Sequence, residues 1–254
     1  MKTRKKVVLV TGADGGIGKA VVDLFLEKGW RVIGVDRHPK KIEANDDFLY
    51  ISADISEPEQ IKKIFEAANN FSPVLDGVIN NAAIQISKPL LELSSDEWDQ
   101  TMASNLRSVF LGAKLAHPLI KAAGGGAIVN VSSVHAIATS ANISAYAASK
   151  GGLLALTRAM AIEFAGDNIR VNAVLPGAVD TPMLRDSMSR GHFSGDSIQV
   201  RLDNLADKTV NGRIGTPQEI AQSIFFLTDN SQSSFMTGQA LVVDGGVTAR
   251  LSSE

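Results

Sequence analysis

The chain contains no cysteine among its 254 residues. Disulfide bonds, thiolate nucleophiles and cysteine-ligated zinc sites are therefore excluded together. The absence of cysteine also fits a protein of a reducing compartment, so we expect a cytoplasmic location.

Histidine is scarce as well, because the sequence has only four, far apart and without the spacing of metal ligands. We therefore expect no protein-held metal ion. No apolar run reaches the roughly 18 residues that a membrane-spanning helix needs. The basic residues at the start lead through a short apolar run into a glycine-rich turn, a pattern that does not predict a secretion signal.

No sign of charge predominates, since 25 basic residues stand against 27 acidic ones, for a formal net charge of -2. The basic residues are scattered, so neither nucleic acid nor a membrane surface is an expected partner. The hydrophobic fraction of 44% is ordinary for a globular protein. With no linker or repeat in the sequence, we expect one domain over residues 1–254.

Short apolar runs alternate with longer amphipathic stretches along the chain. The runs are apolar throughout, which is typical of parallel strands covered on both faces, and their alternation with helices predicts an α/β fold. The expected strands are 5–10, 31–36, 48–54, 75–82, 126–133, 169–176 and 240–244, and the expected helices are 17–29, 57–70, 95–123, 145–165 and 217–229.

Three helix starts carry a serine or threonine followed three residues later by glutamate, the pattern of a reciprocal cap. They begin at Ser56, Ser94 and Thr216, the last followed by a proline. The stretch 180–213 is polar, contains glycine and is too long for an ordinary connection. We expect it to form an irregular substrate-binding lid.

The first strand ends in TGADGGIG, residues 11–18, with glycines at 12, 16 and 18. Such a turn serves either as structure or as a cradle for a pyrophosphate, and its place between a strand and a helix favours the cradle. Asp36 ends the next strand, where its carboxylate can accept ribose hydroxyls and repel a 2'-phosphate. NAD is thus expected over NADP, although Arg37 softens that preference. For Asp54, an adenine contact and a helix cap both stay open.

Tyr146 and Lys150 lie four residues apart on an expected helix and so share one face. An ammonium about 4 Å from the phenol would lower the phenol pKa by about three units at an effective dielectric near 20, to near 7. The alternative is a half-buried tyrosine beside a surface lysine. Ser133 favours the catalytic interpretation, because it ends a strand 13 residues before Tyr146. Ser132 is a weaker candidate, since strand alternation turns its side chain the other way.

With TGADGGIG, Asp36, NNAA at 80–83, Asn105, Ser133, Tyr146-x-x-x-Lys150 and Pro176-Gly177, the chain resembles the short-chain dehydrogenase/reductase family over nearly its whole length. The resemblance implies a doubly wound Rossmann fold with a seven-stranded parallel sheet. It also implies a homotetramer assembled through helices 95–123 and 145–165. Ala83 departs from the family, which more often has glycine there. Gly15 stands where members that use NADP often carry a basic residue.

The resemblance also implies a role for each matching residue. Tyr146 would be the catalytic acid/base, Ser133 would orient the substrate oxygen, Lys150 would hold the nicotinamide ribose, and Asn105 would support a water chain. Asn105, Asn81 and Thr181 each have a structural alternative, as a helix residue, a turn former and a cap. The implied cofactor contacts are Gly12, Asp14, Gly15, Gly16, Ile17, Gly18, Asp36, Arg37, Asp54, Ile55, Asn81, Ala82, Ala83, Tyr146, Lys150, Pro176, Gly177, Val179 and Thr181.

The expected reaction is reversible hydride transfer between a secondary alcohol and NAD, with Tyr146 as acid/base. His135 and Gln85 resemble pocket-wall positions, and both are polar, which favours a polyol, sugar or hydroxy acid as the small-molecule substrate. His135 joins Ser133 and Tyr146 as a substrate contact. One alternative is a 3-oxoacyl thioester reductase of the same family. Another is a catalytically inactive regulator that senses dinucleotides, although such a protein would usually lose the tyrosine or the lysine.

Overall fold

The computed structural model describes residues 4–40, 45–190 and 197–250. Seven strands form one sheet in the order β3-β2-β1-β4-β5-β6-β7, and every neighbouring pair is parallel. The predicted seven-stranded parallel sheet is therefore confirmed. The strands are β1 (Val7–Thr11), β2 (Arg31–Asp36), β3 (Phe48–Ser52), β4 (Gly77–Asn80), β5 (Gly126–Val131), β6 (Ile169–Pro176) and β7 (Ala240–Val243).

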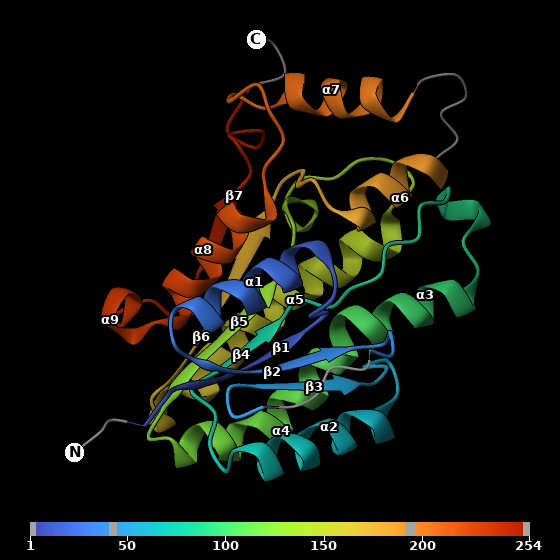
Figure 1. Ribbon diagram of the computed structural model, residues 1–254. Helices are drawn as coiled ribbons and strands as arrows, with labels where there is room; N and C mark the ends of the chain where they lie inside the picture. The colour runs from blue at the N-terminus through green and yellow to red at the C-terminus, as the bar shows by residue number, and fades with distance from the viewer. Residues whose placement is uncertain (1–3, 41–44, 191–196, 251–254) are drawn as a thin grey trace.

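Helices cover both faces of this sheet (Figure 1). One apolar core lies between the sheet and α2, α4 and α5, and the other lies between the sheet and α1 and α8. Central strands are buried along their whole length, as β1, β4, β5 and β6 are, because both of their faces are covered. The helices are α1 (Gly16–Glu27), α2 (Pro58–Phe71), α3 (Ser95–Met102), α4 (Ser108–Ala122), α5 (Ser144–Glu163), α6 (Pro182–Arg190), α7 (Ile198–Lys208), α8 (Pro217–Thr228) and α9 (Asn230–Ser233).

Three aromatic rings join α1 to α8 in the second core. Phe25 packs edge-on against Trp30 and Phe225, with ring centroids 5.0 Å and 5.1 Å away. Aromatic pairs in this arrangement contribute about 0.5–1.5 kcal/mol beyond the area that they bury. The contact holds the last turn of α8 against α1 on this face of the sheet.

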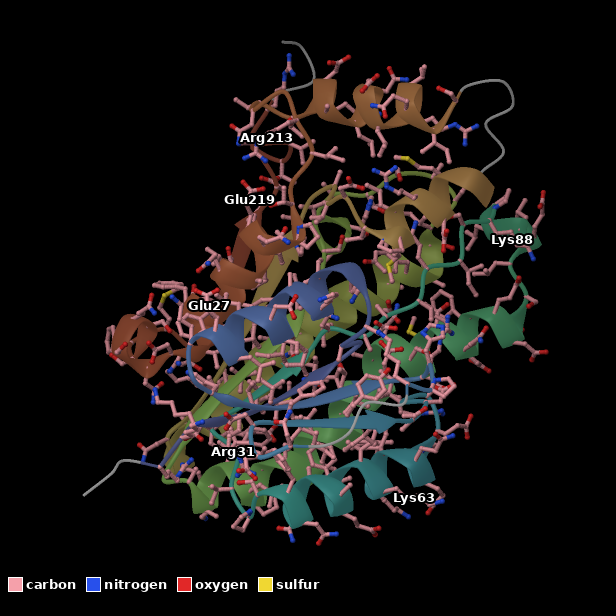
Figure 2. All side chains as sticks on the ribbon, in the orientation of Figure 1. Glu27, Arg31, Lys63, Lys88, Arg213 and Glu219 are labelled. Carbon is pink, nitrogen blue, oxygen red and sulfur yellow. The ribbon has the colours of Figure 1, made fainter. Side chains whose placement is uncertain are left out.

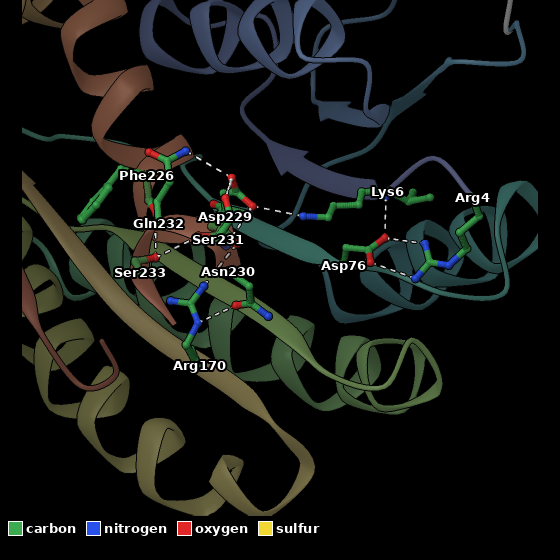
Figure 3. A network of polar contacts seen from close by, with 12 residues as sticks. Arg4, Lys6, Asp76, Arg170, Phe226, Asp229, Asn230, Ser231, Gln232 and Ser233 are labelled. Carbon is green, nitrogen blue, oxygen red and sulfur yellow. Dashed lines mark hydrogen bonds and ion pairs between the residues drawn. The ribbon is translucent and has the colours of Figure 1, made fainter. Parts of the chain in front are cut away.

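The amino ends of the strands are fastened by polar contacts (Figure 3). Arg4 pairs with Asp76 at 2.6 Å, and Lys6 pairs with Asp229 at 3.1 Å. Arg170, which is only 8% exposed, donates from Nε to Asn230 Oδ1 at 2.8 Å. This edge of the sheet is thus occupied by structural contacts, whereas the carboxyl edge is built from loops.

The long helix expected at 95–123 is divided into three parts. Between α3 and α4 the backbone forms a π-helical segment, η2 (Ala103–Arg107), and Asn105 lies within it. A π turn adds a residue to the helix and reorients the side chains that follow, and such turns are frequent at functional sites. Periodicity alone does not reveal this local change.

The stretch 180–213 contains two helices, α6 and α7, so the expectation of an irregular loop is wrong there. Thr181 accepts a hydrogen bond from the Leu184 N–H at 3.3 Å, and Ser197 accepts one from Val200 at 3.3 Å. Each hydroxyl thereby caps a helix. Residues 191–196, which include His192 and Phe193, lie outside the described residues.

The three expected caps have different outcomes. Ser94 and Thr216 form the reciprocal cap with Glu97 and Glu219. Glu219 also binds Arg213 at 2.5 Å at the start of α8 (Figure 2). The prediction for Ser56 is wrong, because α2 begins after Glu57 with Pro58 in its first turn and has no side-chain cap.

This difference predicts unequal effects of two similar substitutions. Thr216→Ala should lower the free energy of unfolding by about 1 kcal/mol, because it removes the cap of α8. Ser56→Ala should change it by less than about 0.5 kcal/mol, as for a surface position away from such features. Urea denaturation of both variants measures the two values, and equal losses would contradict the assignment.

Candidate active site

The sequence-predicted residues gather at the carboxyl edge of the sheet. In the strand order, the chain runs from β1 to one side through β2 and β3, and then returns to the other side with β4. At such a reversal the loops after the strands separate and leave a crevice for ligands. The ends of β2 and β3 and the loops after β1, β4, β5 and β6 carry most of the predicted residues, and α6 lies beyond these ends (Figure 1).

The glycine turn after β1 is shaped by close approach of its own backbone. Gly12 has a φ of +67°, in the left-handed region that favours glycine. A Cβ atom on Gly18 would lie 1.8 Å from the Gly12 carbonyl oxygen. No larger residue fits at position 18 without opening the turn.

The amino terminus of α1 fits the pyrophosphate that the sequence predicts. Gly15 caps this helix without any side-chain hydrogen bond. The first N–H groups of a helix have no partner within it, and together with the helix dipole they attract an anion. Gly15 and Gly16 present no side chain in front of these groups, so the cradle is open to a dinucleotide phosphate.

Asn81 holds the turn from the side. Its Nδ2 donates to the carbonyl oxygens of Thr11 at 3.0 Å and Gly12 at 3.1 Å. Thr11 in turn accepts the N–H groups of Asn81 and Ala82 at Oγ1, each at 3.1 Å. Asn81 is thus a turn former in this structure, and Ala82 and the half-buried Ala83 follow it along the same loop.

Asp36 lies beside the glycine turn, as the sequence predicts, but its carboxylate already has protein partners. Oδ2 accepts the Asp14 N–H at 3.0 Å, and Oδ1 accepts the His38 N–H at 3.2 Å. The His38 ring nitrogen Nδ1 lies 3.1 Å from the same Oδ1. These contacts orient the carboxylate toward the turn, and the neighbouring Arg37 is exposed.

Further charges surround this end of the site. Lys40 forms an ion pair with Asp14 of the glycine turn. Burial raises the pKa of the Tyr50 hydroxyl to about 12, and the Asp36 and Asp14 carboxylates contribute to that shift. The negative charges of these two carboxylates are therefore still felt at the Tyr50 hydroxyl, although basic residues lie nearby.

Asp54 and Ile55 follow β3 at the same edge. The Asp54 carboxylate accepts the Ser56 N–H at 2.8 Å before the helix, and α2 has no side-chain cap, so the helix-cap alternative for this residue is wrong. Ile55 packs against the core below the sheet and lines a small cavity with Thr11 and Ala82. The expected adenine contact of Asp54 stays a prediction.

Tyr146 and Lys150 both lie in the first two turns of α5 and are almost completely buried, at 8% and 2% exposure. Lys150 Nζ lies 5.5 Å from the centre of the phenol ring. It donates a hydrogen bond of 2.7 Å to the Val131 carbonyl at the end of β5. In the described part of the chain this is its only hydrogen bond, and no carboxylate pairs with it.

We expected Lys150 to lower the pKa of the Tyr146 phenol. This prediction is wrong when only the groups of the protein act on the phenol. Burial raises the pKa of Tyr146 to about 12, and a hydrogen bond with Ser133 offsets part of this rise. Burial also lowers the pKa of Lys150 to about 7. Both charged forms lose their hydration in the interior, and this cost exceeds the attraction between them. A phenol pKa near 7 would need an ammonium about 4 Å away and a better-solvated pair than this structure has.

Ser133 lies two residues after the end of β5, beside Tyr146, and is 6% exposed. Its Oγ accepts the His135 N–H at 3.2 Å, so the serine caps the short turn η3 (Val134–Ala136). Ser132 points the other way, as strand alternation predicts, and donates to the Lys150 carbonyl at 3.0 Å. One serine therefore faces the site, and the other anchors the helix that carries the lysine.

Asn105 connects three parts of the site from its place in the π turn. Its amide exchanges two hydrogen bonds with the backbone of Ile84, each at 2.9 Å. It also donates to Ser149 Oγ at 3.1 Å, and Ser149 donates to the Tyr146 carbonyl at 2.7 Å. Asn105 thus ties the loop after β4 to the helix of Tyr146, and its expected water chain stays a prediction.

The loop after β6 closes the other side of the site. A Cβ atom on Gly177 would lie 2.9 Å from Asp244, so Pro176 and Gly177 pass tightly over the end of β7. Val179 is 5% exposed and forms a single bridge with Gly215. Thr181 contacts Gly16, since a Cβ there would lie 2.7 Å from the Thr181 methyl group. Segments distant in the sequence thus meet at the glycine turn.

Two contributors were not singled out from the sequence. Thr11 stands inside the quoted glycine motif, yet its hydroxyl acts on the loop after β4. Ser149 is one residue before the lysine and connects Asn105 to α5. Both are small hydroxyl residues whose partners lie far along the chain, so local patterns give no signal for them.

Among the described residues, no group of three or more histidine and acidic side chains could hold a metal ion. None of the helices in the described ranges has both the length and the apolar composition to cross a membrane.

Comparisons with known proteins agree with this geometry. A family model described as enoyl-(acyl carrier protein) reductase matches residues 12–248. The 3-oxoacyl-[acyl-carrier-protein] reductase FabG of Thermotoga maritima is 34% identical, over 97% of this chain and 99% of that protein. The chain belongs to the short-chain dehydrogenase/reductase family, whose members are oxidoreductases that act on CH–OH groups.

Two solved structures are also similar over nearly the whole chain. The aldohexose dehydrogenase of Thermoplasma acidophilum has a TM-score of 0.91 and 33% identity, and covers 98% of this chain and 96% of its own. ElxO, whose structure has NADP bound, has a TM-score of 0.86 and 28% identity, and covers 97% of this chain and 100% of its own. The single-domain Rossmann fold is thereby confirmed.

The buried lysine predicts a specific pH dependence of stability. Its pKa falls from 10.5 to about 7 on folding, so the unfolded state binds more protons between these values. The wild type should therefore lose stability relative to Lys150→Met as pH falls from about 9.5 to 7, by on the order of a few kcal/mol. Urea denaturation at both pH values measures this.

Lys63→Met is the matched control, because Lys63 is exposed on α2 (Figure 2). Its stability relative to the wild type should be the same at both pH values. If the Lys150→Met difference were also independent of pH, the lysine would not be desolvated as described.

Proposed function

We propose that this enzyme interconverts a secondary alcohol and its carbonyl compound by hydride transfer with NAD. The observation that carries the proposal is the convergence of Ser133, Tyr146 and Lys150 at the end of β5, all less than 10% exposed. They face the same sheet edge as the open glycine cradle. A proton-transferring group and a dinucleotide site thus lie in one crevice.

Ser133 and Tyr146 would hold the substrate oxygen between two hydroxyl groups, because each can donate a hydrogen bond to it. The cofactor, when bound, supplies the site that accepts the hydride from the carbinol carbon or returns it. Tyr146 takes the proton of the alcohol during oxidation and gives it back during reduction. The reaction balances as alcohol and NAD⁺ to carbonyl compound, NADH and a proton.

The raised pKa of Tyr146 favours the protonation state that reduction needs over the one that oxidation needs. Because burial raises its pKa to about 12, the phenol is protonated at neutral pH and ready to donate to a carbonyl oxygen. Oxidation of an alcohol first requires the phenolate. Lys150, close to the ring and poised with a pKa of about 7, is the group that would stabilise that anion once it carries a proton.

Residues around the cradle would hold the dinucleotide in two parts. The backbone of the glycine turn would bind the pyrophosphate, with Asp14 and Ile17 as neighbouring cofactor contacts, and Asp36 with Arg37 would meet the adenosine ribose. Asp54, Ile55 and the loop at 81–83 would flank the adenine side. Lys150 would hold the nicotinamide ribose, and Pro176, Gly177, Val179 and Thr181 would flank the nicotinamide. NAD is favoured over NADP because the negative charge of the Asp36 carboxylate would repel a 2'-phosphate.

The proposed substrate is a polyol, a sugar or a hydroxy acid. Polar side chains at Gln85 and His135 support this class, as does the similarity to an aldohexose dehydrogenase. Residues 180–213 would act as the lid, with apolar Met183 and Leu184 on α6. A 3-oxoacyl thioester reductase remains the second candidate, because FabG is among the similar proteins.

We also propose a cytoplasmic homotetramer with no nucleic-acid or membrane partner. Helices α3, α4 and α5 expose large apolar side chains that a neighbouring subunit would cover. Trp98, Phe110 and Ile162 are 37%, 47% and 79% exposed. Covering such residues is a general driving force of association.

A substrate panel tests the proposal. Polyols, sugars, hydroxy acids and secondary alcohols are offered with NAD, and a 3-oxoacyl thioester is offered with NADPH, while nicotinamide absorbance is recorded. Tyr146→Phe should lower kcat by about 10²–10⁴-fold, the usual contribution of a general acid/base. A variant that keeps its melting temperature and most of its turnover would contradict the role of Tyr146.

A second experiment tests the choice of cofactor. Asp36→Asn keeps the shape of the side chain but removes the charge that opposes a 2'-phosphate. The ratio of kcat/KM for NADP to that for NAD should rise at least about tenfold, equivalent to about 1.4 kcal/mol. Asp23→Asn, an equal charge change on the exposed side of α1, should leave the ratio unchanged. An unchanged ratio in Asp36→Asn would refute the argument for NAD.

A further inference from the structure

We propose that Asn211 is a site of spontaneous covalent modification, at which the asparagine side chain is converted to aspartate and isoaspartate. Asn211 and Gly212 form the only Asn-Gly pair in the sequence, and they lie in the loop between α7 and α8. Neither residue belongs to the groups that the proposed function uses. The inference therefore goes beyond that function and concerns how the protein changes chemically during its lifetime.

The reaction needs only the chain itself and water. The Gly212 backbone nitrogen attacks Cγ of Asn211, and the new C–N bond closes a five-membered imide ring. The bond from Cγ to the amide nitrogen breaks, and ammonia leaves with the proton that the glycine nitrogen has lost. Water then opens the ring at one of its two carbonyl groups, which gives either aspartate or isoaspartate. Nothing is oxidised or reduced in either step.

The backbone at this position leaves room for the attack. Gly212 has a φ of +65°, and a Cβ atom built there would meet no other heavy atom within 4 Å. Glycine also has no side chain to crowd the ring as it closes. Asn211 and Gly212 are both exposed, so the turn can change its backbone angles without disturbing packed side chains.

One hydrogen bond opposes the attack, and it is weak. The Gly212 N–H donates to the Thr209 carbonyl at 3.3 Å, beyond the usual range of about 2.7–3.2 Å. Asn230 is the internal reference, because it also precedes a small residue, Ser231. Its amide is held in place, since Oδ1 accepts a hydrogen bond of 2.8 Å from Arg170 Nε at the start of α9.

The modification acts on a loop that is fastened on both sides. The Asn211 N–H donates to the Gly245 carbonyl at 3.2 Å, and Thr209 Oγ1 accepts the Arg213 N–H at 3.1 Å. Isoaspartate carries the chain through its side-chain carbon and thus adds one methylene between these fixed points. The added length should displace Arg213, which binds Glu219 at the start of α8 (Figure 2).

The two products should have different effects on stability. Aspartate keeps the length of the backbone and adds one negative charge at a cleft of about 110 Å³, which Arg213 and Asp244 also line. An exposed charge that meets one cation and one carboxylate changes stability little. Isoaspartate alters the backbone, so it is the product that should weaken the loop.

Storage of the wild type, Asn211→Gln and Asn211→Asp tests the site. Each protein is kept at body temperature and mildly alkaline pH, and a second portion is kept frozen. Peptide mapping by mass spectrometry measures the loss of each amide, and an isoaspartate methyltransferase measures isoaspartate. Asn211 should lose its amide at least about tenfold faster than Asn230. Asn211→Gln should gain no isoaspartate at this position, because its longer side chain would have to close a six-membered ring.

Melting temperatures measure the effect on the loop. Stored wild type in which most chains carry isoaspartate should melt about 2–4 °C below the frozen portion, as for the loss of one stabilising contact in a chain of this length. Stored Asn211→Gln and freshly purified Asn211→Asp should melt within about 1 °C of the frozen wild type.

The outcomes separate the chemistry from its effect on the fold. The modification site is refuted if Asn211 keeps its amide as long as Asn230 does. The effect on the loop is refuted if the modified wild type melts with its frozen portion. It is also refuted if stored Asn211→Gln, or fresh Asn211→Asp, loses as much stability as the modified wild type.

Discussion

The desolvation of one ammonium group governs the architecture of this site. Lys150 is almost completely buried. Among the described residues, its ammonium group donates to one carbonyl oxygen, at the end of β5. A buried cation without a carboxylate costs free energy unless its surroundings keep it where it has a function. The surrounding contacts therefore have to hold α5 closely in register with the sheet.

Three polar contacts provide this register, each between α5 and an element distant in sequence. Ser132 binds the Lys150 carbonyl, and Asn105 binds Ser149. Farther along, Asn130 in β5 donates to Thr157 at 2.8 Å. Buried hydrogen bonds cost free energy when broken, so together they resist rotation or sliding of the helix. The same frame that buries the lysine thus also orients Tyr146 toward Ser133.

The frame extends from α5 to the glycine turn. Asn105 binds the loop after β4 through Ile84, and the same loop carries Asn81, which holds the Gly12 carbonyl. The proposed proton-transferring groups and the proposed phosphate cradle are therefore linked through one short loop. This linkage gives the π turn a physical reason, because a regular helix would orient Asn105 differently.

Several features could not be read from the sequence. Ser56 and Thr216 share one local pattern, yet only Thr216 caps its helix, since the chain before α2 enters by another path. The helices in 180–213 begin at hydroxyl residues that cap them. Such residues are also common in loops, so the sequence alone did not indicate these helices. The pKa of Tyr146 moved opposite to the expectation because burial, a property of the whole fold, outweighed the proximity of the lysine.

The sequence by itself determined the α/β class, the seven strands and the candidate residues of the site, because apolar periodicity and motif spacing are local properties of the chain. Only the tertiary structure decided which polar groups meet across the sheet and how far each is removed from water. Those properties depend on packing between distant segments, and no local pattern encodes the resulting dielectric environment.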